Sequence, residues 1–300
     1  MKLKKMLALT MAAVLAAGLT ACGSSADTSA APAAESTAAT ADAAGAPDGD
    51  GDPTTLTVAM ECAYAPYNWT QSDDSNGAVA IRGSSDYAYG YDVMMAKKIG
   101  EALGQQVQIV KLDWDSLIPA VMSGDVDCVI AGQSITAERA AQVDFSNPYY
   151  YASIVTLTKK DSAYANAASV ADLAGATATS QLGTIWYDTC LPQIEGTQLM
   201  PASETAPAMV MAVTSGTVDF ICTDMPTAMG ACATYDNLVI LDFSGSEDNF
   251  KVDAGEINIG ISVVKGNTSL LDAMNAVLSE MTVEDMNRIM NDAIAVQPAI

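Results

Sequence analysis

A segment that occurs twice in the chain constrains its fold more than any other feature. AVMSGDVDCVI, which begins at Ala120, is repeated as AVTSGTVDFIC from Ala212. Each copy has the pattern of a helix end, a glycine near the helix C-cap and a buried strand. The first copy follows strand-like TLTVAM, helix-like DVMMAKKIGEAL closed by Gly104, and strand-like VQIVKL. Although such junctions also recur by chance in α/β proteins, this arrangement predicts two similar α/β lobes.

The N-terminal segment has the order of a secretory signal. Lys2, Lys4 and Lys5 precede an apolar run over residues 6–19, which is too short for a comfortable transmembrane helix. The run ends in LTAC, which resembles the lipobox of bacterial lipoproteins, whose cysteine is lipidated. We therefore expect a lipoprotein signal peptide over residues 1–21 and lipidation at Cys22. An ordinary signal that is cut at small residues is the alternative.

The following residues have the composition of a tether. From residue 23 to about residue 53 the chain is almost entirely Ala, Ser, Thr, Asp, Gly and Pro, which cannot bury a core. Together with Cys22, this segment forms a predicted tether over residues 22–53. The folded part is expected to begin near Thr54.

Charge and composition exclude several classes of function. The formal net charge is -23 and the chain has no histidine. A strongly acidic surface argues against nucleic-acid binding, because a phosphate backbone requires basic residues. Without histidine, Ser-His and Cys-His catalytic pairs and histidine metal sites are excluded. The classes of function that remain are carboxylate chemistry, binding and scaffolding.

The cysteines outside the lipobox do not form a recognisable framework. They are odd in number, irregularly spaced and without a CxxC pair, so we predict buried single thiols and no metal site. These cysteines are Cys62, Cys128, Cys190, Cys222 and Cys232.

Polar and aromatic residues follow the predicted strands. Ligands of open α/β sheets bind beyond the carboxyl ends of the strands, so these positions are the candidates for a binding site. The set draws on both lobes and suits binding more than catalysis. Its members include Glu61, Tyr64, Asp113, Trp114, Gly132, Gln133, Ser134, Thr136, Gly183, Thr184 and Asp224.

Arg139 is one of only three arginines in the chain. Thr136 is a good N-cap for a helix through Ala140 and Ala141, which places Arg139 in the first turn, where the helix dipole disfavours a cation. A solvated surface arginine is one interpretation. The other is a carboxylate bound between the guanidinium and free N–H groups, with the predicted helix start after Gly183 offering further donors.

These residues carry a family resemblance. From about Thr54 to Ala295 the chain resembles the family 3 extracellular solute-binding proteins of bacterial polar amino-acid ABC transporters. CAYAPYNW, GYDVMMAKKIGEALG, DWDSLIPAVMSGDVDCVIAG, SITAERAAQVDFSNPYYY and TDMP follow the family's order. The resemblance implies two α/β lobes joined by two hinge strands, with the ligand in the cleft. Lobe I would comprise residues 54–152 and 256–300 and lobe II residues 153–255, with crossovers near NPYYYASIV and AGEINIGISV.

The resemblance also implies a role for individual residues. Arg139 would hold the α-carboxylate of an amino acid, with help from Ser134, Thr136 and Thr184. Asp224 would take the α-ammonium. Lobe closure is then favoured by a ligand that contacts both lobes.

The ligand side chain would meet Tyr64 and Trp114 on its flanks and Glu61 at its far end. A neutral ligand would leave Glu61 as an unpaired buried charge, which is costly, whereas a cation would pair with it and lie between the rings. We therefore predict arginine first, then lysine or ornithine. If Glu61 accepts a hydrogen bond from an amide, the ligand is glutamine; a cystine-binding homologue and a solvent-facing Glu61 are further alternatives.

Two features depart from the family pattern. Gln133 stands where an apolar residue is more usual, and the connection TQSDDSNGAVAIRGSSDYAYG is longer than usual. The first bears on the polar fit near the ligand backbone, and the second bears on the rim of the cleft.

The expected protein is a lipid-anchored extracytoplasmic monomer that delivers a polar amino acid to an ABC permease and ATPase. It needs no cofactor and no metal, and it is not an enzyme. Two other classes stay open. One is a dehydratase-like enzyme that uses Glu61 and Asp224 as acid and base, and the other is a lipid-anchored sensor or adhesion module.

Overall fold

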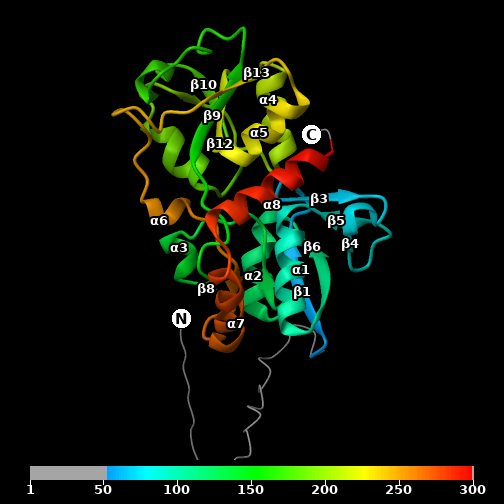
Figure 1. The fold of residues 1–300 in the computed structure, drawn as a ribbon. Helices are drawn as coiled ribbons and strands as arrows, with labels where there is room; N and C mark the ends of the chain where they lie inside the picture. The colour runs from blue at the N-terminus through cyan, green and yellow to red at the C-terminus, as the bar shows by residue number, and fades with distance from the viewer. Residues whose placement is uncertain (1–52, 299–300) are drawn as a thin grey trace, which may run out of the picture. The chain divides into compact units, whose positions relative to one another are not determined.

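Two five-stranded sheets form the framework of residues 53–298, the part of the chain that this computed structural model describes (Figure 1). The predicted signal peptide, the lipidation site Cys22 and the tether up to residue 52 lie outside the described residues. No helix within residues 53–298 is both long and apolar enough to cross a membrane.

The first sheet has the strand order β6-β1-β7-β14-β8. β6, β1 and β7 run parallel, and β14 pairs antiparallel with both β7 and β8. Its central strands are buried apolar runs, as expected of a sheet covered on both faces. The strands are β1 (Thr55–Met60), β6 (Gln106–Lys111), β7 (Cys128–Val129), β8 (Asp144–Phe145) and β14 (Ser262–Val263).

The second sheet repeats this pattern with the order β11-β10-β12-β9-β13. β11, β10 and β12 are parallel, and β9 is antiparallel to β12 and β13. The two copies of the repeated segment lead into β7 and β12, which occupy equivalent places in the two sheets, so the prediction of two similar α/β lobes is confirmed. The strands are β9 (Ile154–Lys159), β10 (Thr177–Thr179), β11 (Gln198–Leu199), β12 (Phe220–Asp224) and β13 (Leu238–Leu241).

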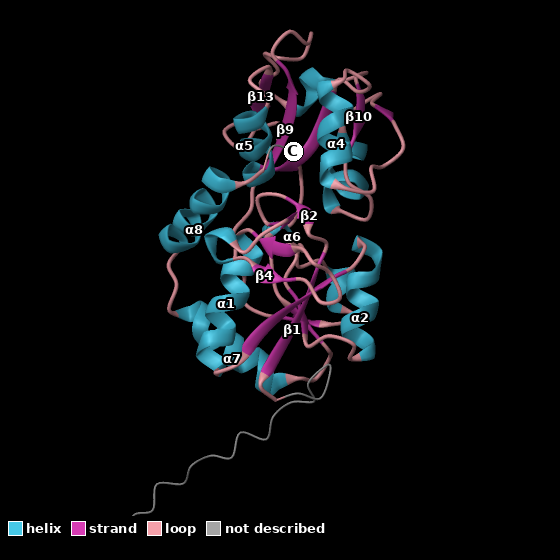
Figure 2. Cartoon of the chain, turned by 90° about the vertical axis from the view of Figure 1, so that its right-hand side faces the viewer, coloured by secondary structure: helices cyan, strands magenta, loops and turns pink. Residues whose placement is uncertain are grey.

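Helices cover both faces of each sheet. In Figure 2, α1 and α7 lie on one side of β1 and α2 on the other, while α5 and α4 flank β9. α8 packs against both α1 and α5 and so contacts the helices of both sheets. The helices are α1 (Tyr91–Leu103), α2 (Leu117–Ser123), α3 (Ala137–Ala140), α4 (Ala206–Thr214), α5 (Met225–Thr234), α6 (Ala254–Ile257), α7 (Thr268–Ser279) and α8 (Val283–Val296).

Local sequence signals explain several helix ends. Gly104 and Gly124 close α1 and α2 in the left-handed conformation, with φ of 70° and 79°. In the second copy of the repeat, Ser215 is the C-cap residue of α4, and Gly216 follows it with φ of 76°. Thr136 caps α3 as predicted, but α3 is a single turn that ends at Ala140.

The chain passes twice between the sheets. One passage leads from Tyr150 into β9, and the other leads from α6 to β14. A bridge between Tyr150 and Ile259 joins the two passages. The first sheet takes all its strands from the predicted lobe I and the second from the predicted lobe II, while the boundaries at residues 152 and 255 stay predictions.

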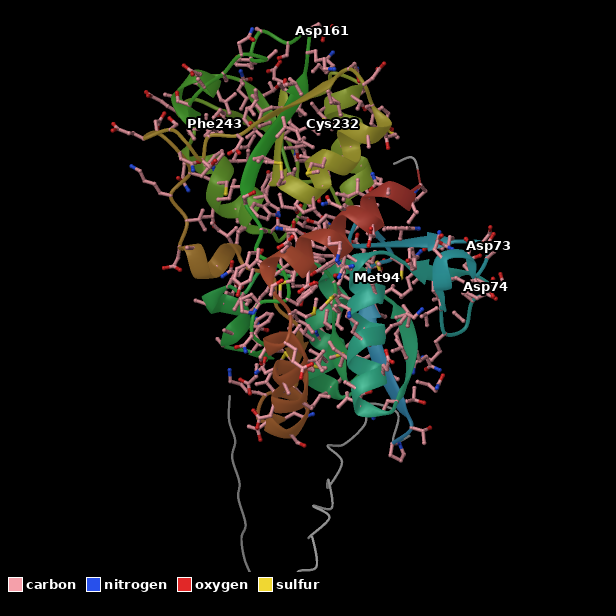
Figure 3. All side chains as sticks on the ribbon, viewed as in Figure 1. Asp73, Asp74, Met94, Asp161, Cys232 and Phe243 are labelled. Atoms are coloured by element: carbon pink, nitrogen blue, oxygen red, sulfur yellow. The ribbon has the colours of Figure 1, made fainter. Side chains whose placement is uncertain are left out.

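The long connection after Trp69 contributes β4, β5 and the end of β3 to a small separate sheet, with the order β2-β3-β5-β4. Ile81 attaches this small sheet to Ile109 at the β6 edge of the first sheet. Asp73 and Asp74 project from it (Figure 3) and are exposed. Its strands are β2 (Ala63–Tyr64), β3 (Asn68–Gln71), β4 (Val79–Ala80) and β5 (Tyr87–Tyr89).

The cysteines of the described part carry free thiols. Cys62, Cys128, Cys190 and Cys222 are buried, as predicted, whereas Cys232 on α5 is only half-buried. Residues 53–298 contain no group of three or more Cys, Asp and Glu side chains that could hold a metal ion.

Candidate ligand-binding site

The carboxyl ends of strands from both sheets bring the predicted site residues together around Trp114. This residue begins a 3₁₀ turn, Trp114–Ser116, and two residues separate it from the end of β6. Its ring lines three neighbouring cavities, of about 520 Å³, 340 Å³ and 10 Å³. The smallest lies between Tyr64, Arg139, Gln181 and Thr184 and holds no more than a single water.

Arg139 carries a guanidinium group without an ionic partner. Nη1 donates to the carbonyl oxygen of Ser134 at 2.9 Å, and Nη2 donates to that of Gly183 at 2.8 Å. The guanidinium carbon lies 5.3 Å from the centre of the Trp114 ring. No carboxylate among residues 53–298 forms a salt bridge with Arg139, and burial lowers the pKa of this side chain to about 10. The site therefore contains a half-buried cation whose guanidinium group is bonded only to neutral carbonyl groups.

Asp224 is a buried acidic residue at the end of a strand of the second sheet. It ends β12, is 1% exposed and caps α5 by accepting from the amide of Thr227 at 2.9 Å. The hydroxyl of Tyr64 donates to Oδ2 of Asp224 at 2.5 Å and covers the carboxylate. Burial raises the pKa of Asp224. Asp224 lines none of the three cavities around Trp114, and the Tyr64 hydroxyl lies on its Oδ2.

Glu61 follows β1 and is 5% exposed. Its Oε2 accepts a hydrogen bond from Nε2 of Gln181 at 3.1 Å, which links the ends of β1 and β10. Burial raises the pKa of Glu61 to about 7, and the bond from Gln181 opposes that shift. Glu61 does not point to solvent, because it is buried and faces the cavity of about 340 Å³.

The loop after β7 supplies backbone and side-chain groups next to Arg139. Gly132 has φ of 63°, and a Cβ at this position would lie 2.7 Å from Cε1 of Tyr64, so a larger residue would push the ring away. The side chain of Gln133 accepts a hydrogen bond from Ser262 on β14 at 3.2 Å. The amide oxygen of Gln133 is therefore hydrogen-bonded to β14, the strand that follows the second passage between the sheets.

The hydroxyl residues predicted to assist Arg139 lie near it, but no side-chain hydroxyl among them bonds to its guanidinium group. Thr136 Oγ1 accepts from the amide of Arg139 at 3.2 Å, and Thr184 Oγ1 donates to the carbonyl oxygen of Gln181 at 2.7 Å. Ser134 contributes its carbonyl group. The helix that follows Thr184 is a π-helix over Trp186–Cys190. The structure thus brings all ten predicted residues to one region, and their roles toward a ligand stay predictions.

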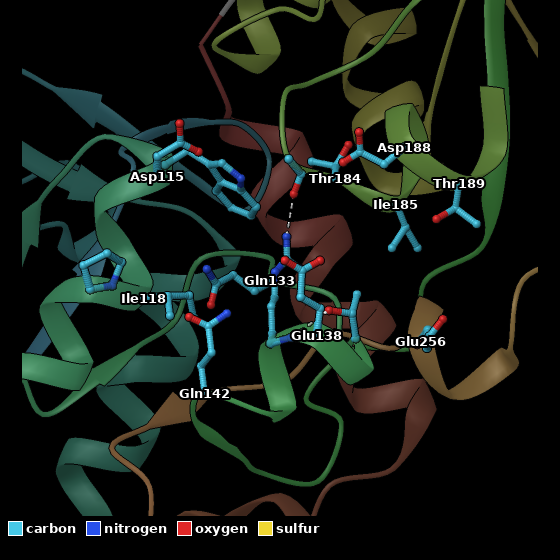
Figure 4. Close-up of a pocket in the computed structure, with 15 residues that line it drawn as sticks. Asp115, Ile118, Gln133, Glu138, Gln142, Thr184, Ile185, Asp188, Thr189 and Glu256 are labelled. Carbon is cyan, nitrogen blue, oxygen red and sulfur yellow. Dashed lines mark hydrogen bonds between the residues drawn. The ribbon is translucent and has the colours of Figure 1, made fainter. Parts of the chain in front are cut away.

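Carboxylates surround the largest cavity at the outer side of Arg139. Figure 4 shows Glu138, Asp188 and Glu256 around this cavity, with the dashed bond from Arg139 to Gly183 between the two sides. Glu256 also accepts a hydrogen bond from the amide of Ala137 at 3.1 Å, which ties α6 to the start of α3. The residues of the long connection, 70–90, line none of the three cavities around Trp114, so this insertion does not form their rim.

Sequence reasoning missed several residues of this site. Gln181 and Trp186 line the smallest cavity, and Gln181 was detectable as the last residue of the strand-like TATSQ. Tyr149 accepts from the amide of Gly132 at 2.9 Å and donates to Asp92 Oδ1 at 2.7 Å, so it positions the loop after β7. Burial raises the pKa of Asp92 to about 7. No local sequence signal predicts this chain of hydrogen bonds from Gly132 through Tyr149 to Asp92.

Known proteins resemble this chain over most of its described length. The family model of the bacterial extracellular solute-binding proteins, family 3, matches residues 56–293. The arginine-binding extracellular protein ArtP of Bacillus subtilis is 34% identical over 130 residues, 43% of this chain and 45% of that protein, less than half of its length. The L-cystine-binding protein TcyJ of Escherichia coli K12 is 26% identical over 230 residues, 76% of this chain and 77% of that protein.

Solved structures share the fold. The crystal structure of the ancestral amino acid-binding protein AncCDT-1, a precursor of cyclohexadienyl dehydratase, has a TM-score of 0.65 and 28% identity, and the match covers 80% of this chain and 96% of that one. The two sheets and the charged groups between them define a two-lobe solute-binding protein. The chain belongs to the bacterial extracellular solute-binding proteins, family 3.

Proposed function

We propose that this protein binds a basic L-amino acid, arginine first and then lysine or ornithine, and delivers it to an ABC permease and ATPase. The observation that carries the proposal is the guanidinium of Arg139, which has no salt bridge within residues 53–298 and donates only to the carbonyl groups of Ser134 and Gly183. A ligand carboxylate would supply the missing counter-charge with two parallel hydrogen bonds.

The proposed ligand orientation follows from the other two charges. Asp224 would take the α-ammonium after the Tyr64 hydroxyl has moved aside, and Glu61 would take the cation of the side chain. Because a neutral side chain would leave Glu61 buried without a charge partner, a basic amino acid fits this set best. The name of the relative ArtP supports arginine.

We infer that the lobes separate to admit a ligand between Arg139, Asp224 and Glu61, because the cavities of about 520 Å³ and 340 Å³ are not lined by Asp224. The cavity between Tyr64, Arg139 and Gln181 has a volume of about 10 Å³, whereas sites for small molecules are about 300 to 1,000 Å³. We infer that the ligand enters an open form and that contacts to both lobes then favour closure.

A second part of the proposal concerns the N-terminal segment that precedes the described residues. We propose that Cys22 is lipidated and that residues 22–53 tether a monomeric binding protein to the outer face of the cell membrane. Mass spectrometry of the mature N-terminus tests this directly, because an unmodified terminus at another residue excludes lipidation at Cys22.

A glutamine ligand is the second candidate, and one contact favours it. Glu61 accepts its hydrogen bond from the neutral amide of Gln181, which is the kind of donor that a glutamine side chain would offer. A cystine ligand has support from the name of TcyJ. A dehydratase-like enzyme and a sensor or adhesion module have no contact in the site that favours them.

The test is to identify the ligand and then to titrate it. Ligand released from the purified, denatured protein is identified by mass spectrometry, and the refolded protein is titrated with arginine, lysine, glutamine, cystine and glutamate by calorimetry. We expect arginine to bind most tightly and Glu61→Gln to weaken it. Tighter binding of glutamine, cystine or glutamate would contradict the proposal, conversion of the ligand would indicate an enzyme, and no binding would favour a sensor or adhesion module.

A further inference from the structure

Tyr67 carries a buried hydroxyl group without a hydrogen-bond partner. The residue lies between β2 and β3 and is 0% exposed. Its phenol oxygen is one of the buried side-chain atoms within residues 53–298 that have no partner. A hydroxyl that is buried in this way is costly, and a phenylalanine would fill nearly the same space without that cost. The hydroxyl therefore requires an explanation beyond the packing of the ring.

The Tyr67 hydroxyl lies near the proposed ammonium site. The ring stacks on that of Tyr64, with centres 4.9 Å apart and planes 24° apart. It also packs edge-on against Tyr91 and Tyr150. Burial raises the pKa of Tyr67, and the charge of Asp224 raises it more than any other charge does. The ring is thus held on three sides, and its hydroxyl lies within the influence of the carboxylate that the Tyr64 hydroxyl contacts.

The carboxylate of Asp224 has few acceptor positions left for a ligand. A carboxylate offers about four lone-pair positions. Oδ1 accepts from the amide of Thr227, and Oδ2 accepts from the hydroxyls of Thr227 and Tyr64. When the Tyr64 hydroxyl moves aside, about two positions are open, whereas an ammonium group has three N–H donors. One donor then needs an acceptor from another group, because an unpaired donor in a buried site is costly.

We propose that the hydroxyl oxygen of Tyr67 is this acceptor, which makes Tyr67 a specificity-determining residue for the α-ammonium of the ligand. This inference rests on the proposed function, because that function places the ammonium at Asp224. The two stacked tyrosines then have different roles. Tyr64 covers Asp224 in the unliganded protein, and Tyr67 accepts a hydrogen bond from the ammonium in the complex. A ligand without an α-ammonium gains nothing from the Tyr67 hydroxyl.

Tyr67→Phe tests this role with two ligands. L-Arginine carries the α-ammonium, and 5-guanidinopentanoate has the same carboxylate and guanidinium without it. Calorimetry with the full chain, by competition for the weaker ligand, gives the ratio of the two affinities. We expect Tyr67→Phe to lower the preference for arginine about tenfold or more, the contribution of a hydrogen bond to a charged group. Because both ligands are titrated into one preparation, the ratio does not depend on the fraction of folded protein.

Thr156→Val is the matched control. Oγ1 of Thr156 is likewise buried without a partner in the described structure, and the residue lies on β9. Thr156 lines none of the three cavities around Trp114. The variant removes an unpaired buried hydroxyl away from these cavities, so it should leave the preference for arginine unchanged. Thermal unfolding of both variants verifies that they are folded.

The outcomes separate the role of Tyr67 from the proposed function. If the wild type binds arginine but Tyr67→Phe weakens both ligands equally, or neither, the role of Tyr67 is wrong and the proposed function stands. An equal fall of the ratio in Thr156→Val would also overturn the role, because loss of any buried hydroxyl would then explain it. If the wild type binds neither arginine nor lysine, both proposals are wrong.

Discussion

Tyr64 and Asp224 join the two lobes through one hydrogen bond of 2.5 Å, from the phenol hydroxyl to Oδ2. Tyr64 lies on β2 beside the first sheet, and Asp224 ends β12 of the second sheet. Tyr67 stacks on Tyr64 with ring centres 4.9 Å apart, but its buried hydroxyl has no hydrogen-bond partner in the described structure. The Tyr64 hydroxyl is thus hydrogen-bonded to a buried carboxylate, whereas the neighbouring Tyr67 hydroxyl is buried without a hydrogen bond in the described structure.

Tyr64→Phe and Tyr67→Phe should therefore behave differently. Removing the Tyr64 hydroxyl takes a donor from a buried carboxylate and should lower the stability of the unliganded protein by about 1 to 3 kcal/mol. The same change should strengthen arginine binding, because the ligand ammonium no longer displaces a hydroxyl. Tyr67→Phe should leave stability unchanged or raise it. Denaturant unfolding and calorimetry of both variants check this, and equal stability losses would contradict it.

Arg139→Ala should abolish arginine binding in a protein that still folds. Removing one partner of a desolvated charge pair costs about 2 to 5 kcal/mol, or roughly 30-fold or more in affinity. Arg82→Ala is the matched control, because Arg82 is exposed and lines none of the cavities around Trp114. Unchanged affinity in Arg139→Ala would mean that Arg139 only joins the loops of Ser134 and Gly183.

Asp224→Asn should discriminate between ligands with and without an α-amino group. Asparagine is also a good N-cap, so α5 should keep its start while the negative charge is lost. We expect arginine to lose far more affinity than 5-guanidinopentanoate, which lacks the ammonium. Similar losses for the two ligands, measured by calorimetry, would remove Asp224 from the ammonium site.

Arginine affinity should depend on pH through Glu61. Burial raises the pKa of Glu61 to about 7 in the unliganded protein, so below pH 7 the cation must first drive off a proton. Affinity should fall as pH decreases from 7 toward 4.5, by at most about tenfold per pH unit for one proton. Glu61→Gln should weaken binding at pH 8 and flatten this dependence. If the wild type and Glu61→Gln show the same pH dependence of arginine affinity, Glu61 is not the cause of that dependence.

The same pKa shift has a consequence for stability, with a defined sign. Because the folded pKa of Glu61 is raised above its ordinary value of 4.5, the folded state binds more protons than the unfolded state between pH 4.5 and 7. The contribution of Glu61 is fully present below pH 4.5 and is lost as pH rises through about 7. Asp92, whose pKa burial also raises to about 7, adds to this loss. Urea unfolding of the unliganded protein at pH 5 and pH 8 measures the combined effect, and Glu61→Gln should reduce it.

Much of the fold was predictable because its signals are local. The apolar runs of β1 and β6, the glycine that closes α1 and the threonine that caps α3 each act on neighbouring backbone groups. The repeated segment added the non-local element, since it predicted equivalent strands in two sheets. The extra sheet over residues 63–89 and the π-helix at Trp186–Cys190 were not predicted, because short antiparallel pairings and the choice of helix type depend on packing.

The sequence by itself determined which residues stand at the strand ends, and with them the charged groups of the site. Only the tertiary structure decided their partners on the other lobe, which are Asp224 for Tyr64, Gln181 for Glu61 and Gly183 for Arg139. A strand pattern fixes which side chains face the edge of a sheet, since its period is local. Which group meets which across the cleft depends on how two separately packed sheets approach, and no local interaction of the chain encodes that approach.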